Sequence, residues 1–348
     1  MNFTDTGLQA EILQATEELG YIQPTAIQQA TIPDILETET DILALAQTGT
    51  GKTAAFGLPL IQLTDTASKH IQTIVLCPTR ELCIQITNDM DAYSKHVKGY
   101  SNVAVYGGAD IKQQIQAIRK GCHTVVGTPG RVMDLIRRKV MDLSRIKWVV
   151  LDEADEMLNM GFKEDLNTIL SQTPDHKRVL LFSATLAKDV AAIARKYMNN
   201  PKEISVGSRN QGAENVRHEF YVVHAKDRYA ALKRIADIYP NIYGIVFCRT
   251  RRITREVAQK LIDDGYNTDA LHGELSQAQR DQVMSRFRQR QVQLLIATDV
   301  AARGLDVNDL THIINYDLPD DNEVYIHRTG RTARAGKSGV AISIIHTR

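Results

Sequence analysis

The sequence has few cysteines, and their spacing suggests neither a disulfide framework nor a metal site. The four residues are scattered through 348 positions without a C-x-x-C pair: Cys77, Cys83, Cys122 and Cys248. This usage is typical of reduced thiols in a cytoplasm-like compartment. No apolar run approaches the roughly 18 residues of a membrane span, and residues 1–10 lack the basic and apolar regions of a secretory signal. We therefore expect a cytoplasmic protein without membrane association.

A strong net charge is absent as well. Lys and Arg number 42 against 41 Asp and Glu, a net charge of +1. This balance excludes binding driven by a basic tail but leaves room for a local groove of donors. With 43% hydrophobic and 24% charged residues, the composition is that of an ordinary globular protein. The length predicts about two domains.

Short β-branched runs alternate with amphipathic helical patterns, such as 111–120 and 189–197, in the first part of the chain. Continuous apolar strands that alternate with helices indicate a mostly parallel sheet with helices on both faces. The runs that we predict to be strands are 41–46, 73–78, 102–107, 123–128, 148–152 and 178–184.

The stretch 199–220 breaks this alternation with Pro, Gly, Ser and Asn residues, so we place a linker within it. Further predicted strands follow at 243–248, 269–273, 292–299, 311–317 and 339–345. We predict an α/β protein with two tandem domains, 1–205 and 217–348, joined by a flexible linker at 206–216. The last predicted strand leaves no room for a closing helix before Arg348, so we expect the second domain to be truncated at its end.

The first strand leads into "AQTGTGKT" at 46–53, which resembles a P-loop with Ala46 in place of the first glycine. Gly49 and Gly51 can adopt positive φ angles that turn backbone N–H groups inward. These groups and the following helix N-terminus form an anion site for phosphates. Lys52 reaches the β- and γ-phosphate oxygens, and the Thr53 hydroxyl can bind Mg²⁺.

The run "WVVLDEADEML" at 148–158 places four carboxylates at the end of an apolar strand. A P-loop needs a second strand that ends in an acid to hold Mg²⁺, and Asp152 takes that position. Glu153 can orient or deprotonate a water in line with the γ-phosphate. We expect Asp155 to pair with a neighbouring polar motif and Glu156 to be a solvated helix residue.

These motifs closely resemble the DEAD-box ATP-dependent RNA helicases of superfamily 2, over nearly the whole chain. The residues "DEAD" at 152–155 follow the P-loop, and the other motifs occur in family order. They are "GYIQPTAIQ" (20–28), "PTREL" (78–82), "GG" (107–108), "TPGR" (128–131), "SAT" (183–185), "QAQR" (277–280), "ATDVAARGLD" (297–306) and "HRTGRTARAG" (327–336). The resemblance implies two RecA-like domains, ATP and Mg²⁺ as cofactors, and RNA-stimulated ATP hydrolysis coupled to cleft closure and local, non-processive unwinding of short RNA duplexes.

The resemblance also implies a set of nucleotide contacts. Tyr21 stacks on the base, and the Gln28 carboxamide selects adenine because it can bond the N6 and N7 edge in both directions. Arg331 and Arg334 resemble the arginine fingers that reach the γ-phosphate when the domains close. The remaining contacts implied are Gln47, Thr48, Gly49, Thr50, Gly51, Lys52 and Thr53 in the loop, and Gly304 and Asp306 in the second domain.

An RNA track across both domains is implied in the same way. Its residues are Arg80, Gly108, Thr128 and Arg131 in the first domain, and Thr250, Arg280 and Thr298 in the second. Asp155, Ser183, Thr185 and His327 are implied to couple the nucleotide and RNA sites. Small residues with a few arginines suit phosphate and 2′-OH contacts without base reading, and a single Trp leaves little material for base stacking.

Two departures from the family pattern are Thr329, usually aliphatic, and Ala333, often Gly. A DNA helicase or translocase of the same superfamily is an alternative, which "PTREL" and "SAT" disfavour. An ATP-gated clamp that holds or anneals RNA has the same motifs and stays open. A GTPase or metabolic kinase is disfavoured by the second-domain arginines. We expect a monomeric core that binds RNA and has room for protein partners.

Overall fold

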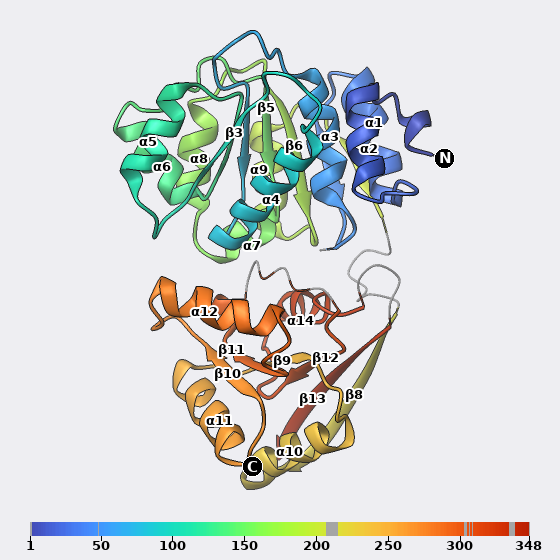
Figure 1. Ribbon diagram of the computed structural model, residues 1–348, viewed down its shortest axis with the longest axis vertical. Helices are drawn as coiled ribbons and strands as arrows, with labels where there is room; N and C mark the ends of the chain where they lie inside the picture. Colours follow the sequence, from blue (N-terminus) through green and yellow to red (C-terminus); the bar gives the residue numbers. More distant parts are fainter. Residues whose placement is uncertain are drawn as a thin grey trace. The chain divides into compact units, whose positions relative to one another are not determined.

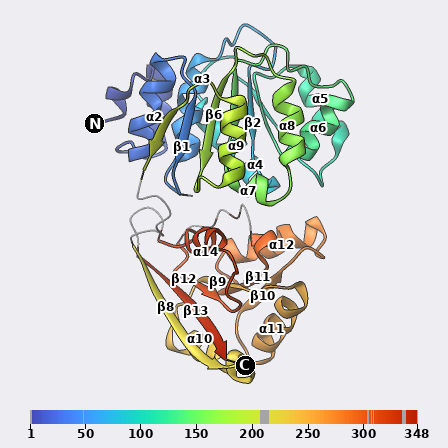
Figure 2. The ribbon, with the colours of Figure 1, turned by 180° about the vertical axis from the view of Figure 1, so that it is seen from behind.

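The computed structural model describes residues 2–47, 49–206, 215–302, 305, 307, 309–333 and 338–347. The chain divides into two compact units, Met1–Arg209 and Asn210–Arg348. Each unit is built on one sheet with helices on both faces (Figures 1 and 2). Most of the predicted linker, 206–216, lies outside the described residues, so its boundaries stay a prediction. None of the described helices combines the length and the hydrophobicity that a membrane span requires.

In the described part of the first unit, seven parallel strands form a sheet in the order β3-β4-β2-β5-β6-β1-β7. Their bounds are β1 (Ile42–Leu45), β2 (Thr73–Leu76), β3 (Asn102–Val105), β4 (Thr124–Gly127), β5 (Trp148–Leu151), β6 (Arg178–Ser183) and β7 (Lys202–Ser205). Parallel strands end at the same edge of a sheet, so the loops after β5, β6 and β1 lie next to one another.

The helices of this unit divide between the two faces of the sheet. Along β5, Trp148 and Val150 face one apolar cluster, and Val149 and Leu151 face the other. Figure 1 shows α4 in front of the sheet, and Figure 2, from behind, shows α9 there. The first cluster packs against α1 (Ala10–Glu18), α2 (Ala26–Glu37), α3 (Lys52–Leu63) and α4 (Arg80–Tyr93). The second packs against α5 (Ile111–Lys120), α6 (Pro129–Arg137), α7 (Ala154–Asn159), α8 (Lys163–Ser171) and α9 (Lys188–Tyr197).

The described part of the second unit contains a parallel sheet in the order β10-β11-β9-β12-β13-β8. The strands are β8 (Val216–His224), β9 (Gly244–Phe247), β10 (Thr268–Leu271), β11 (Leu294–Ala297), β12 (His312–Asn315) and β13 (Gly339–Thr347). The helices are α10 (Arg228–Ile238), α11 (Arg251–Asp263), α12 (Gln277–Arg288), α13 (Asp299–Ala302) and α14 (Asn322–Thr329). A short 3₁₀ turn, Ala225–Asp227, precedes α10, and the first unit has a similar turn at Phe3–Thr6. Apolar clusters again fill both faces.

The predicted α/β fold with two parallel sheets is confirmed, and each predicted strand overlaps an observed one. The stretch 199–220, in which no strand was predicted, holds one observed strand and the start of another. Strand β7 pairs with β1, and β8 pairs with β13. Both are edge strands whose side chains are mostly exposed, so they lack the continuous apolar run that marked the buried strands.

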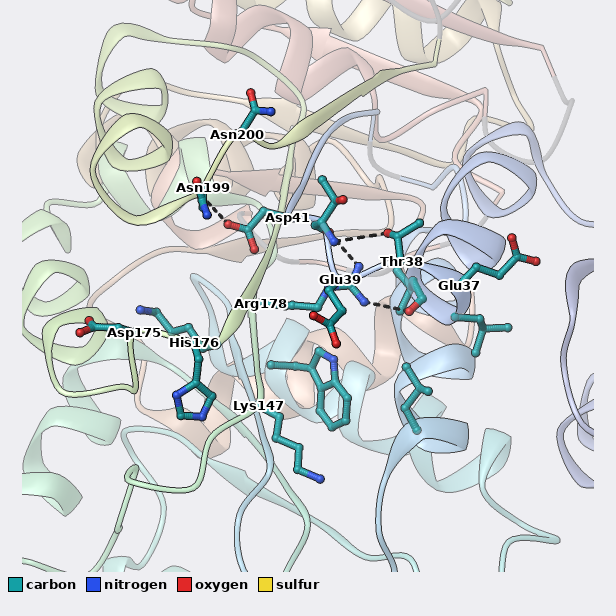
Figure 3. Close-up of a pocket in the computed structure, with 16 residues that line it drawn as sticks. Glu37, Thr38, Glu39, Asp41, Lys147, Asp175, His176, Arg178, Asn199 and Asn200 are labelled. Atoms are coloured by element: carbon teal, nitrogen blue, oxygen red, sulfur yellow. Dashed lines mark hydrogen bonds between the residues drawn. The ribbon is translucent and has the colours of Figure 1, made fainter.

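Two charged side chains tie the amino ends of the first sheet together. The Asp41 carboxylate accepts hydrogen bonds from the backbone N–H groups of Val179 and Asn199, both at 2.7 Å. Arg178 donates to the carbonyls of Ile35 and Thr40, at 2.9 and 2.8 Å. Asp41, Arg178 and Asn199 line a cavity of about 1010 Å³ (Figure 3). It lies at the amino ends of the strands, the edge opposite the carboxylates that follow β5.

We expect Asp41→Asn to lower the free energy of unfolding of the first unit by about 1–3 kcal/mol, because an amide leaves one buried N–H group without an acceptor. Trp148, the single tryptophan, is buried in this unit, so its fluorescence in a urea titration measures the change. Asp142→Asn is the control, since Asp142 is exposed and accepts one backbone hydrogen bond, from Ser144. Equal losses for the two variants would contradict the role of Asp41.

Candidate nucleotide and RNA sites

The loop between β1 and α3 has the backbone shape of a phosphate cradle. Gly49 and Gly51 have φ angles of 81° and 88°, and Gly51 is the N-cap residue of α3. A Cβ atom at Gly51 would lie 2.4 Å from Gln28 Nε2. The backbone angle therefore favours glycine at position 51, and a side chain there would displace the Gln28 carboxamide.

The charged groups of the predicted site meet in a buried position. Lys52 is 6% exposed, and its Nζ lies 3.8 Å from Asp152 Oδ1. No hydrogen-bond acceptor reaches Lys52 Nζ among the described residues. Burial is the main cause that raises the pKa of the Asp152 carboxyl to about 6; the Lys52 ammonium opposes this shift, and the Glu153 carboxylate adds to it. The negative charges of Asp152 and Glu153 are thus only partly balanced by the positive charge of Lys52.

Glu153 is held in a strained conformation next to this pair. Its φ angle is 52°, in the left-handed region, and it is the N-cap residue of α7. The side chain is 5% exposed, and its Oε2 atom has no hydrogen-bond partner in the described part of the chain. A left-handed non-glycine residue costs of order 1–3 kcal/mol and is typical of functional sites. The free buried oxygen can accept a proton or a hydrogen bond from a bound water.

Asp155 connects the end of β5 to the end of β6. One of its carboxylate oxygens accepts hydrogen bonds from Ala184 N (3.2 Å), Thr185 N (2.9 Å) and Thr185 Oγ1 (3.0 Å). Ser183 Oγ donates to the Thr185 carbonyl at 2.8 Å. The expected pairing of Asp155 with a polar motif is confirmed, and the motif is "SAT".

The expectation that Glu156 is solvated was wrong, because it is 2% exposed. The first turn of α7 is buried as a whole, and α7 packs against α9 and β6. A six-residue helix shows too little periodicity for its buried face to be recognised from the sequence.

The expected metal ligands are a hydroxyl and a carboxylate, from Thr53 and Asp152. Across the described part of the chain, no group of three or more His, Cys, Asp or Glu side chains could hold a metal ion by itself. Mg²⁺ usually takes one or two protein oxygens and completes its shell with phosphates and water. The oxygen donors and the partly compensated carboxylates fit that ion.

Asp152 should make the stability of the nucleotide-free protein depend on pH. Its folded pKa, about 6, exceeds the unfolded value of about 3.9. The folded state therefore binds this proton more tightly, and stability falls as the pH rises through about 6. We expect the Tm difference between Asp152→Asn and the wild type to be more positive at pH 8 than at pH 5, measured with Trp148 fluorescence in EDTA. A difference that is independent of pH would contradict the raised pKa.

Gln28 contacts the phosphate loop, whereas Tyr21 packs against Phe3 and Tyr93. Gln28 is 4% exposed; its Oε1 accepts from Thr25 N at 2.9 Å, and its Nε2 donates to the Gly51 carbonyl at 3.1 Å. A carboxamide has two lone pairs and two N–H groups, so one of each is left for a ligand. The Tyr21 ring stacks on Phe3, with centroids 6.2 Å apart, and is 37% exposed.

The predicted RNA residues of the first unit follow the carboxyl ends of β2, β3 and β4. The Arg80 guanidinium lies 5.0 Å from the centroid of the Tyr106 ring. Gly108 has a φ angle of 81°, and Thr128 is the N-cap residue of α6. Arg131 Nη1 donates to Gln114 Oε1 at 2.9 Å. The supporting Tyr106 and Gln114 were missed by the sequence analysis, since neither belongs to a recognised motif.

The RNA residues predicted in the second unit lie at the corresponding edge of its sheet. Thr250 follows β9, is exposed and caps α11 by accepting from Ile253 N at 3.2 Å. Thr298 follows the neighbouring strand β11 and is 7% exposed. Arg280, in the first turn of α12, donates to the Ala301 carbonyl at 3.4 Å. Thr250 and Thr298 directly follow the adjacent strands β9 and β11, whereas Arg280 belongs to the helix after β10.

The arginines of "HRTGRTAR" have different surroundings. Arg331 is 6% exposed and donates to the Leu305 carbonyl at 3.2 Å. Arg328, which the sequence analysis did not single out, is 4% exposed and donates to both carboxylate oxygens of Asp299, at 2.6 and 2.8 Å. Arg328 therefore joins α14 to α13. The predicted residues Thr48, Gly304, Asp306 and Arg334 lie outside the described residues.

Of the two departures in the last motif, Thr329 is accommodated, whereas Ala333 is held in a strained backbone conformation. Thr329 is fully buried, and its hydroxyl donates to the Ile326 carbonyl at 3.1 Å, so no polar atom is left unsatisfied in a position that is usually aliphatic. Ala333 has a φ angle of 56°, a region that glycine enters without strain. His327, in the same helix, is 8% exposed.

The fold and the site define the class: an ATPase with a P-loop and two RecA-like units. A family model described as DEAD/DEAH box helicase matches residues 25–193, and one described as Helicase conserved C-terminal domain matches residues 227–336. The chain is 44% identical to the DEAD-box ATP-dependent RNA helicase CshA of Geobacillus kaustophilus, over 99% of this chain and 74% of that protein. It is 43% identical to the ATP-dependent RNA helicase CshA of Listeria monocytogenes, over 99% of this chain and 66% of that protein.

Solved structures agree with these relatives. The structure of S. cerevisiae Dbp5 bound to RNA and ADP BeF3 aligns with a TM-score of 0.91 and 32% identity, covering 100% of this chain and 90% of that chain. A DEAD box protein from Methanococcus jannaschii aligns with a TM-score of 0.59 and 45% identity, covering 100% and 94%. The chain therefore belongs to the DEAD-box family of ATP-dependent RNA helicases.

Proposed function

We propose that this chain couples RNA-stimulated hydrolysis of ATP to closure of its two units and to local, non-processive unwinding of short RNA duplexes or remodelling of RNA–protein complexes. The observation that carries the proposal is the buried pair Lys52 and Asp152, beside the strained Glu153 and above a phosphate cradle. This arrangement suits the hydrolysis of a phosphoanhydride.

In this proposal Thr53 and Asp152 hold Mg²⁺, which neutralises phosphate charge when it is bound. Lys52 contacts the phosphate oxygens, with backbone groups of Gln47, Thr48, Gly49, Thr50 and Gly51. Glu153 orients the attacking water and accepts its proton. Tyr21 stacks on the base, and the free N–H and lone pair of Gln28 select adenine. Gly304 and Asp306 contact the ribose.

Arg331 and Arg334 complete the site from the second unit. A guanidinium neutralises the charge that develops on the γ-phosphate oxygens. Hydrolysis then requires both units, so closure becomes a condition for turnover.

The RNA strand follows Arg80, Gly108, Thr128 and Arg131 in one unit and Thr250, Arg280 and Thr298 in the other. Contacts to phosphate and 2′-OH groups give binding without base reading. Asp155, Ser183, Thr185 and His327 link this track to the nucleotide. Because the coupling is thermodynamic, RNA raises ATP affinity as ATP raises RNA affinity. The core acts as a monomer in the cytoplasm, and protein partners add specificity.

The test is steady-state ATP hydrolysis with single-stranded RNA, with DNA of the same sequence and with neither, followed by unwinding of a short RNA duplex. We expect stimulation by RNA and little by DNA. Equal stimulation by DNA would overturn the substrate assignment. RNA-stimulated hydrolysis with slow RNA release and little strand separation would favour the ATP-gated clamp.

A further inference from the structure

Several arginines gather at the start of α11 in the second unit. Arg251, Arg252 and Arg255 have side chains that are 59%, 74% and 56% exposed. They follow Thr250 at the carboxyl end of β9, next to β11, whose loop carries Thr298. The N-terminus of a helix adds a positive field of its own. This edge of the second sheet is therefore suited to bind an anion.

One carboxylate already bridges two of these arginines. Glu274 Oε1 lies 3.3 Å from Arg251 Nη1, and Glu274 Oε2 lies 3.2 Å from Arg255 Nη1. Glu274 belongs to the loop after β10 and is itself 42% exposed. Guanidinium groups bind carboxylates and phosphates in the same geometry. The two oxygens of Glu274 thus occupy positions that a phosphate could take.

The neighbouring carboxylates pair with other arginines, not with Arg251 or Arg255. Arg252 pairs with Glu256, one turn along the same helix, at 2.7 Å, and Arg249 pairs with Asp320 at 2.9 Å. His272, two residues before Glu274, is buried. Burial lowers its pKa, and Arg255 and Arg251 lower it further, against the opposite effect of Glu274. The arginines therefore create a positive field at the loop that carries Glu274.

We propose that Arg251 and Arg255 form a phosphate-binding site for the RNA strand, and that Glu274 occupies this site until RNA displaces it. The inference rests on the proposed RNA-binding function and extends it by a competitor within the chain. Because exposed ion pairs are weak, Glu274 lowers RNA affinity by only about two- to fivefold.

The test measures the Kd of a fluorescein-labelled single-stranded RNA by anisotropy at several salt concentrations, with ADP and beryllium fluoride. Glu274→Gln should tighten binding about two- to fivefold. Arg251→Ala combined with Arg255→Ala should weaken binding and reduce the slope of log Kd against log salt by about 0.7, the value for one phosphate on a single strand. Adding Glu274→Gln to this double variant should change nothing further, since no competition remains.

Glu256→Gln is the matched control for Glu274→Gln, because it also removes one negative charge beside these arginines, but Glu256 pairs with Arg252 and does not touch the bridge. If Glu256→Gln tightens binding as much as Glu274→Gln, the effect is general charge and the proposal fails. An unchanged salt slope in the double variant would also overturn it. If the wild-type chain does not bind RNA at all, the proposed function fails first. All substituted side chains are exposed, and circular dichroism melts check that each variant is folded.

Discussion

Replacing Glu153 by glutamine is expected to lower RNA-stimulated ATP turnover by about 10²–10⁴-fold, the usual contribution of a general base. The amide keeps the size of the side chain and its left-handed N-cap position, so the fold should persist. It cannot accept the proton of the attacking water. ATP affinity should be retained, because Lys52 and the phosphate cradle are unchanged.

Two measurements check this result: steady-state phosphate release and equilibrium binding of a fluorescent ATP analogue. Glu156→Gln is the matched control, since Glu156 is also a buried glutamate, in the first turn of the helix that Glu153 caps, but is not proposed to reach the nucleotide. Its turnover should stay close to that of the wild type. If Glu153→Gln keeps most of its turnover, or if both variants lose it equally, the assigned role of Glu153 is wrong.

Arg331→Ala is expected to lower turnover by about 10³–10⁵-fold, the effect of losing an arginine finger. Arg331 is buried and donates to a backbone carbonyl, that of Leu305. The variant should lose one hydrogen bond, which costs about 0.5–1.5 kcal/mol of stability. The loss should therefore be in kcat, with nucleotide binding to the first unit preserved.

Arg328→Ala provides the contrast within the same helix region. Breaking a buried ion pair costs about 3–5 kcal/mol, and the partial exposure of Asp299, 29%, places this case toward the lower end of that range. Arg328→Ala should therefore lower the Tm of the second unit much more than Arg331→Ala, as followed by far-UV circular dichroism. If Arg331→Ala instead unfolds the unit while keeping turnover per folded molecule, the finger assignment fails.

The strands with continuous apolar runs could be predicted from the sequence alone. In a sheet covered on both faces, every residue of a central strand is buried. The apolar runs "TIVL" and "WVVL" could therefore be recognised as central strands. The same reasoning brought Asp152 near Lys52, because parallel strands share a carboxyl edge. The positive φ angles of the glycines in the phosphate loop could also be predicted, because they depend only on the local sequence of the loop.

Other features depended on contacts that no local pattern encodes. Strand β8 is exposed along most of its length, and only its pairing with β13 defines it. The burial of Glu156 follows from the packing of α7 on α9 and β6. The sequence did not distinguish Arg328 from the other two arginines of its motif. Its structural role follows from the ion pair with Asp299, which lies 29 positions away in the chain.

The sequence by itself determined the chemistry of this protein: which residues can bind phosphate, supply a carboxylate or neutralise charge, and on which strand ends they occur. The tertiary structure decided the environment of each group. It buried Lys52 and Glu153 and left each of them an atom that can contact a ligand. It also engaged Arg328 and Asp155 in hydrogen bonds within the chain. It also placed Glu274 between two arginines. Chemical type is a property of a residue, whereas burial and pairing arise only when distant segments pack together.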